Sequence, residues 1–103
     1  MAYKFSPKDP AETVLITFDF TDVLDAGNKE IILSAIWTVE TIVGIDAQPQ
    51  LIFGNWTPSI NISSTSRLIT GGINGCTYNI HVVATTSQNQ VFKMTSSLEI
   101  KTQ

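Results

Sequence analysis

Apolar and polar residues alternate along several stretches of the chain, which is the pattern of strands that bury one face. Residues 14–20 read VLITFDF, and the alternate apolar side chains fall on one face. The same alternation runs through residues 78–85 and, with a small serine in the row, through residues 92–100. Each of these three segments is therefore predicted to be a strand. The large side chains that we expect in the core from them are Phe18, Phe20, Tyr78 and Phe92.

Residues 31–41 read IILSAIWTVET and predict a further strand, because β-branched residues are dense and turn residues flank them. Trp37 is expected in the core, with Leu33 on the same face. Ile32 and Ile36 fall on the opposite face by the same alternation, so they are candidates for an exposed contact surface.

Glycine, proline and small polar residues separate these strands. Residues 21–30 are expected to form a loop, with a helical turn that can tuck Leu24 under the sheet. Residues 40–62 are expected to hold one or two short strands, and residues 63–70 another. The structural turn before the strand at Tyr78 is assigned to Gly71, Gly72 and Gly75.

About seven short strands joined by polar turns, with no convincing helix, predict an all-β fold. We expect an immunoglobulin-like or fibronectin type III-like antiparallel β-sandwich, because Trp37 is placed like the buried tryptophan of a central strand. Tyr78 is placed like the tyrosine of such folds whose hydroxyl bonds back to the backbone of the preceding loop. The chain shows no repeat or linker, so residues 1–103 are expected to form one domain, in which residues 1–11 can be an extended N-terminal arm.

The balance of charge argues against nucleic acid as a partner. The chain has 6 Lys and Arg against 9 Asp and Glu, a net charge of -3, and its basic residues are scattered. No apolar run is long enough to span a bilayer, and the first ten residues lack the pattern of a secretory signal. With a single cysteine and hence no internal disulfide, the protein is expected to fold in a reducing cytoplasm.

Cys76 and His81 are the first candidates for catalysis, because a cysteine nucleophile needs a base within reach. In a strand, residues five apart point to opposite faces and lie about 16 Å apart, so no catalytic pair is expected. Asp19, Asp22 and Asp25 recur every three residues but lack the ligand pattern of a calcium loop, and capping roles are expected instead. The sequence thus predicts no catalytic residue, metal or cofactor, and a non-enzymatic function.

Two long segments carry a family resemblance. Residues 8–39 read KDPAETVLITFDFTDVLDAGNKEIILSAIWTV, with a KDP start, an acidic-aromatic strand, a leucine-containing loop ending in glycine, and the pattern I-x-S-A-x-W-T-V. Residues 68–100 read LITGGINGCTYNIHVVATTSQNQVFKMTSSLEI, with a G-G-x-x-G-x-x-Y turn and a T-T-S before the last hairpin. In this order the motifs resemble small bacteriophage structural proteins of the fiber-tail adaptor or minor tail family. Cys76, where threonine or serine is expected, and the longer, more apolar segment 40–66 depart from the family pattern.

The resemblance implies a passive module of the virion, made in the cytoplasm of the bacterial host, that acts through protein–protein contacts. An adaptor that joins tail and fiber, or other tail components, is the leading hypothesis, with several copies in a symmetric assembly. A capsid decoration or cement protein is an alternative. Another is a carbohydrate-binding or adhesion module, for which Trp56 and Tyr3 are the available aromatic platforms.

The candidate partner interface combines the two isoleucines above with apolar residues of the irregular region: Ile32, Ile36, Leu51, Phe53 and Trp56. Aromatic and aliphatic side chains gathered in a loop can form a binding hot spot. The alternative for Phe53 and Trp56 is that they plug the edge of the sandwich, which the frequent burial of aromatic side chains favours.

Overall fold

The computed structural model describes residues 2–102, apart from the side chains of residues 2–4 and 26, so the Tyr3 platform considered above lies outside it. Within these residues the chain forms seven strands and two short 3-10 helices. The strands are β1 (Ala2–Lys4), β2 (Thr13–Asp19), β3 (Ile32–Val43), β4 (Ser59–Ile60), β5 (Ser64–Thr70), β6 (Thr77–Thr86) and β7 (Val91–Glu99). The 3-10 helices are η1 (Ala26–Asn28) and η2 (Pro49–Phe53). The all-β prediction is confirmed.

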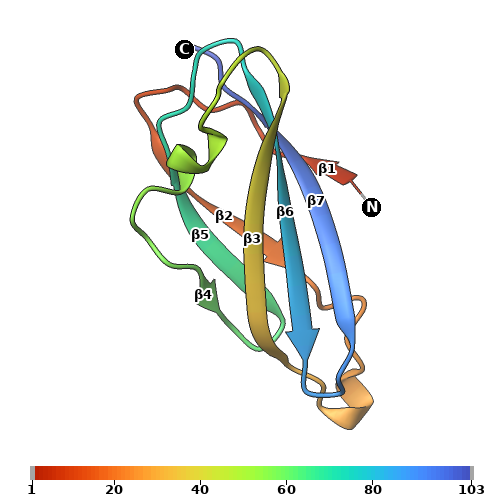
Figure 1. Ribbon diagram of the computed structural model, residues 1–103. Helices are drawn as coiled ribbons and strands as arrows, with labels where there is room; N and C mark the ends of the chain where they lie inside the picture. The colour runs from red at the N-terminus through yellow and green to blue at the C-terminus, as the bar shows by residue number, and fades with distance from the viewer. Residues whose placement is uncertain (1, 103) are drawn as a thin grey trace.

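The strands form two sheets that pack against each other (Figure 1). One sheet has the order β1-β7-β6-β3, in which β1 runs parallel to β7 and the other pairs are antiparallel. The second sheet is antiparallel and has the order β2-β5-β4. The molecule is elongated, with extents of 44 × 24 × 23 Å between Cα atoms, so its loops gather at two distant ends.

Strand β6 is the central element of the core. Its side chains alternate strictly, and the inward row from Tyr78 through Ile80 and Val82 to Ala84 is fully buried. Phe18 and Phe20, from β2 and the residue after it, are buried opposite them. Phe92, predicted in the core, is only half-buried and packs against it, because it lies near the end of β7.

The predicted alternation is wrong at the start of β3. Ile32 pairs with Thr86 and Ser34 pairs with Thr85, so Leu33 is an extra residue, as in a β-bulge. A one-residue shift exchanges the two faces of a strand. Ile32 is therefore buried, at 4% exposure, whereas Leu33 is 59% exposed. Beyond the bulge the predicted phase returns, and Trp37 is buried.

The segment 40–62 holds one short strand, as predicted, and also contributes to the core. β3 continues to Val43, and only the two residues of β4 add another strand. η2 buries Ile52 and Phe53, and the Phe53 ring packs edge-on against Trp37 with ring centroids 6.2 Å apart. This short helix therefore closes the edge of the molecule beside β3.

The glycine turn and the N-terminal segment meet at the start of β6. Gly72 has a φ of 96°, and a Cβ there would lie 2.7 Å from Ile100, so only glycine fits. Gly71 and Gly75 also have positive φ angles. Lys8 is buried and donates from Nζ to the Gly71 carbonyl at 2.7 Å, which ties the N-terminal segment to this turn. Burial lowers the pKa of Lys8.

Candidate interaction surfaces

The five residues proposed as a partner interface lie in different environments. Ile36, Leu51 and Trp56 are 63%, 64% and 41% exposed, whereas Ile32 and Phe53 are buried. Ile36 pairs with Val83 on the outer face of the four-stranded sheet, while Trp56 lies beside the three-stranded sheet. Ile32 is removed from the interface by the bulge at Leu33, and Phe53 by its place in η2 against Trp37.

Trp56 lies over the outer face of the three-stranded sheet. It lines a shallow hollow of about 280 Å³ together with Leu15, Leu68 and Arg67. A Cβ at Gly54 would lie 2.9 Å from the Trp56 ring, so the glycine permits a close approach of ring and backbone. Arg67 Nη2 donates to the Trp56 carbonyl at 2.8 Å. These contacts hold a partly exposed indole beside two partly exposed leucines.

Arg67 connects this surface to the buried plug. Its guanidinium carbon lies 4.1 Å from the centroid of the Phe53 ring, which is a cation–π contact. Burial lowers the pKa of Arg67. Phe53 is thus buried at the edge of the sandwich, which is one of the two alternatives that the sequence allowed. Trp56 is partly exposed at the surface.

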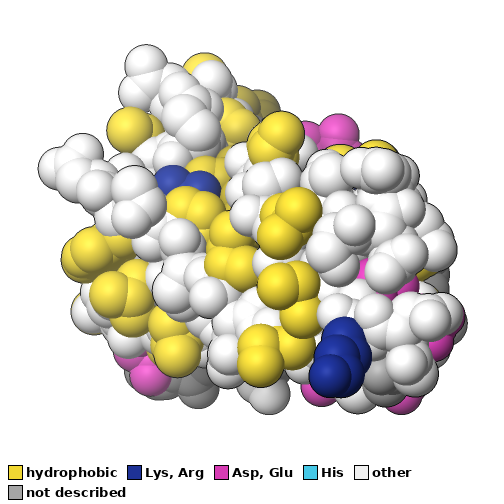
Figure 2. Space-filling model, turned by 90° about the horizontal axis from the view of Figure 1, so that it is seen from below, with side chains coloured by type: hydrophobic (Ala, Val, Ile, Leu, Met, Phe, Trp, Pro, Cys, Tyr) yellow, Lys and Arg dark blue, Asp and Glu magenta, His cyan; other side chains and the backbone are white. Residues whose placement is uncertain are grey.

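One end of the molecule carries apolar side chains around η1. Val23, Ile31 and Ile62 are exposed there, and Leu24 is partly exposed. All but Val23 line a hollow of about 320 Å³, together with Lys29. Figure 2 looks at this end of the molecule and shows hydrophobic side chains gathered across it. We call this surface, defined by these four apolar residues, the η1 end.

The opposite end carries a second apolar group around Gly44. Val43, Ile45 and Ile73 are exposed, with Ile45 almost fully so. Tyr78 braces the loops beneath them: its hydroxyl donates to Asp46 Oδ2 at 2.7 Å and accepts from the Ile73 N–H at 3.1 Å. Burial and the bond to Asp46 raise the pKa of Tyr78. We call Val43, Ile45 and Ile73 the Gly44 end.

Cys76 and His81 do not approach each other as a catalytic pair. Cys76 is buried, and its Sγ donates to the Ile45 carbonyl at 3.7 Å. His81 is on the other face of β6, where its ring contacts Thr95 Oγ1 at 2.7 Å and Glu40 Oε1 at 3.2 Å. Within the described residues, no group of three His, Cys, Asp or Glu side chains is placed to hold a metal ion. No helix in residues 2–102 is long and apolar enough to cross a bilayer.

The three regularly spaced aspartates have separate roles. Asp25 accepts from the backbone and side-chain amides of Asn28 and so caps η1. Asp19 accepts from the hydroxyl and the N–H of Thr21, and these bonds lower the pKa of Asp19. Asp22 instead lines a hollow beside β7, together with Asp19.

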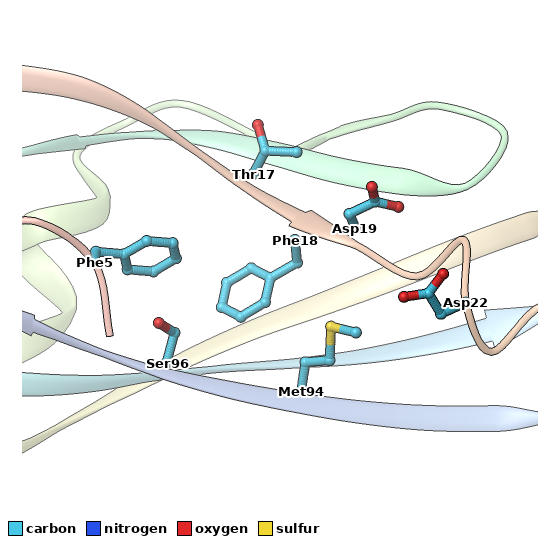
Figure 3. Close-up of a pocket in the computed structure, with 7 residues that line it drawn as sticks. All are labelled: Phe5, Thr17, Phe18, Asp19, Asp22, Met94 and Ser96. Atoms are coloured by element: carbon cyan, nitrogen blue, oxygen red, sulfur yellow. The ribbon is translucent and has the colours of Figure 1, made fainter. Parts of the chain in front are cut away.

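The hollow between β2 and β7 has about 390 Å³ of space. Its lining is apolar in the middle and acidic at one end (Figure 3). The lining residues are Phe5, Thr17, Phe18, Asp19, Asp22, Met94 and Ser96. Sequence reasoning missed this site because it joins segments far apart in the chain. The available signal was Ser96, a hydroxyl at an inward-facing position of a strand.

Comparison with known proteins gives one family. The family model described as podophage GP4 fiber-tail adaptor protein gp77 matches residues 8–99 of the chain. A search of curated proteins found no match. The matched residues include β2 to β7, and therefore both apolar ends and most of the hollow between β2 and β7.

Proposed function

Because this chain belongs to the podophage fiber-tail adaptor family, we propose that it joins a tail component to a fiber component through direct protein–protein contacts. The match over residues 8–99 is the observation that carries the proposal. It supports a structural role in the phage tail, and hence a place in the virion, over the capsid decoration and carbohydrate-binding alternatives. A function without catalysis agrees with such a role.

The surface of the molecule supports a joining role. The η1 end and the Gly44 end both expose clustered aliphatic side chains, and the 12 residues of β3 run between them. Exposed apolar clusters on a small protein are typical of contact sites with other proteins. Two such ends allow one copy to contact two different partners at once.

The remaining elements of the proposal concern fold and assembly. We propose that the chain is a single immunoglobulin-like sandwich domain whose N-terminal arm follows the edge of β7. Several copies act in a symmetric ring, where many weak contacts together give a stable joint. The protein is made in the host cytoplasm and joins the particle during assembly.

The test uses phage particles that lack this protein, complemented with variants of the full chain. Ile62→Glu charges the η1 end and Ile45→Glu charges the Gly44 end; both side chains are exposed, so folding should be retained. We expect wild-type protein to restore fibers to tails. One variant should bind tails without recruiting fiber, and the other should bind fiber without attaching to tails, as measured by immunoblotting of purified particles and of free fiber complexes.

Ile36→Glu charges the outer face of the four-stranded sheet, where Ile36 remains an exposed interface candidate, and restored fibers with this variant would confine the partner contacts to the two ends. Wild-type protein that binds capsids lacking tails would contradict the proposal in favour of a decoration role. Particles that carry normal fibers without this protein would contradict any adaptor role.

A further inference from the structure

We propose that the unpaired half of the β7 edge and the hollow beside it bind an extended segment of a partner protein that carries a lysine or arginine. This inference rests on the proposed adaptor function and adds how one partner is held. The bound segment would lengthen the four-stranded sheet and place an apolar side chain into the hollow.

The first observation is the free backbone of β7. Phe5 N–H donates to the Ser97 carbonyl and Lys8 N–H to the Glu99 carbonyl, so odd-numbered residues of β7 turn their backbone groups to this edge. Alternation places the backbone groups of Lys93 and Val91 at the same edge. β1 pairs only with Thr95 to Ser97. Within residues 2–102, no strand pairs with the outer edge of residues 91–94, which leaves a template for strand addition.

The second observation is the apolar floor beside this free edge. Phe5, Phe18 and Met94 line the hollow, and the Phe5 and Phe18 rings meet edge-on with centroids 5.6 Å apart. The space of about 390 Å³ is large enough for an aliphatic side chain. In strand addition, backbone bonds supply affinity, and pockets for alternate side chains supply specificity.

The third observation is a hydroxyl without a partner. Ser96 is 0% exposed, and its Oγ has no hydrogen-bond partner among the described residues. Figure 3 shows this hydroxyl turned toward the Phe5 ring, with Phe18 to one side. Buried polar groups are nearly always bonded in folded proteins. The chain thus leaves a buried hydroxyl unsatisfied among its described residues at the wall of the hollow, which indicates that this edge is incompletely packed.

The negative charge at the rim of the hollow favours a positively charged occupant. Asp19 and Asp22 stand at one end of the hollow, and its lining contains no lysine or arginine. The Thr21 bonds that lower the pKa of Asp19 keep this carboxylate ionised. A strand with a basic residue two positions from its apolar anchor, and hence on the same face, is therefore complementary, and an acidic strand is repelled.

A binding experiment tests the edge directly. The probes are two acetylated and amidated seven-residue peptides, Thr-Lys-Thr-Val-Thr-Lys-Thr, in which the valine and both lysines share one face, and the same peptide with glutamate in place of lysine. We expect the lysine peptide to shift the NMR amide signals of Val91 and Lys93. Lys93→Pro removes the outward N–H without removing a hydrogen bond to β6 and should weaken binding about tenfold, whereas Lys93→Ala also lacks the lysine side chain but keeps that N–H and should bind as wild type.

Asp22→Lys is the second variant, since an exposed rim residue can be reversed without risk to folding. It should weaken binding of the lysine peptide, whereas Glu40→Lys, with the same charge change on the outer sheet face, should not. Equal binding of both peptides, or signal shifts confined to other strands, would overturn the inference. So would self-association of the free protein through β7, because a second copy would then be the occupant.

The same variants in the complementation experiment separate this inference from the proposed function. If wild-type protein, Lys93→Pro and Asp22→Lys all restore fibers equally, the adaptor function stands and strand addition at β7 is wrong. If wild-type protein itself restores none, the adaptor function fails, whatever the peptides show. The expected result is restoration by wild type and Lys93→Ala, with at least about a tenfold loss of fibers for Lys93→Pro.

Discussion

Both edges of the molecule contain an edge-on pair of aromatic rings, but the outermost ring is buried at only one of them. At the edge beside β3, Phe53 packs edge-on against Trp37 at 6.2 Å. At the edge between β2 and β7, Phe5 packs edge-on against Phe18 at 5.6 Å. Phe18 and Trp37 also meet edge-on, at 5.2 Å, so four rings form a continuous row between the edges. We call the first the sealed edge and the second the open edge.

The two edges differ in what covers the outermost ring, which is Phe53 at the sealed edge and Phe5 at the open edge. Phe53 is buried, and the Arg67 guanidinium lies over its ring. Phe5 is only half-buried and borders the hollow of about 390 Å³. The two buried hydroxyls follow the same division: Thr65 near the sealed edge has two partners, and Ser96 at the open edge has none among the described residues. Arg67 Nε, over the sealed edge, also lacks a partner among the described residues. A closed edge contributes to stability, and an incompletely closed edge is available for binding.

The largest expected effect comes from removing the two outer rings. Phe53→Ala should lower the free energy of unfolding by about 3–5 kcal/mol, because a buried ring leaves a cavity under Arg67 and beside Trp37. Phe5→Ala should cost about 1 kcal/mol, since its ring is already partly in water. Urea unfolding followed by tryptophan fluorescence measures both. Equal losses would remove the distinction between the edges.

Tyr78 lies in the central strand β6, at neither edge, so its substitution is a reference for the stability effects at the two edges. Tyr78→Phe should cost about 2 kcal/mol at neutral pH, because Asp46 and the Ile73 N–H lose their shared hydroxyl. The raised pKa keeps folded Tyr78 protonated above its ordinary value of 10.0, where the unfolded chain releases its proton. This contribution is complete below pH 10 and is lost as pH rises above it.

The measurement is the free energy of unfolding of both proteins from pH 8 to pH 11. The difference in the free energy of unfolding between wild type and Tyr78→Phe should become smaller above pH 10, because only the wild type carries the titrating hydroxyl. Lys8, whose pKa is lowered by burial, is present in both proteins, so its opposite pH dependence cancels in the difference. A difference in the free energy of unfolding that stays constant with pH would show that the pKa of Tyr78 is not raised in the folded protein.

The elements that the sequence predicted well are those with an uninterrupted period of two. β6 has two paired neighbours and no bulge, so its inward row follows directly from alternation. The start of β3 could not be predicted, because an extra residue at Leu33 is visible only in the pairing with β6. The bracing of the glycine turn by Tyr78 is the hydroxyl-to-backbone bond expected for a tyrosine at that place.

The open edge could not be predicted for a different physical reason. Phe5, Phe18 and Met94 are ordinary apolar residues in their own segments, and no local pattern indicates that a space remains between them. The hollow results from how the N-terminal segment, β2 and β7 lie relative to one another in the folded chain. Sequence could locate Trp56 and Leu51 as surface candidates, but Phe53 beside them is buried through a tertiary contact with Trp37.

A smaller effect is expected from the bonded hydroxyl near the sealed edge. Thr65 Oγ1 accepts from Trp37 Nε1 at 3.1 Å and donates to the Ser59 carbonyl at 2.8 Å. Thr65→Val keeps the shape and leaves the indole N–H buried without an acceptor, which should cost about 1–2 kcal/mol. Chemical unfolding measures the loss. A neutral result would mean that water reaches the indole at this edge.

The smallest effect is expected at the open edge, where Ser96→Ala removes a hydroxyl that is 0% exposed and has no partner among the described residues. Since no bond is lost, the free energy of unfolding should stay constant or rise by less than about 1 kcal/mol. Thr65→Val is the matched control, because it also deletes one buried hydroxyl. If Ser96→Ala costs as much as Thr65→Val, the hydroxyl is already bonded in the free protein, for example to water in the hollow. The two hydroxyls would then be equally satisfied, and Ser96 would no longer indicate that the open edge is incompletely packed.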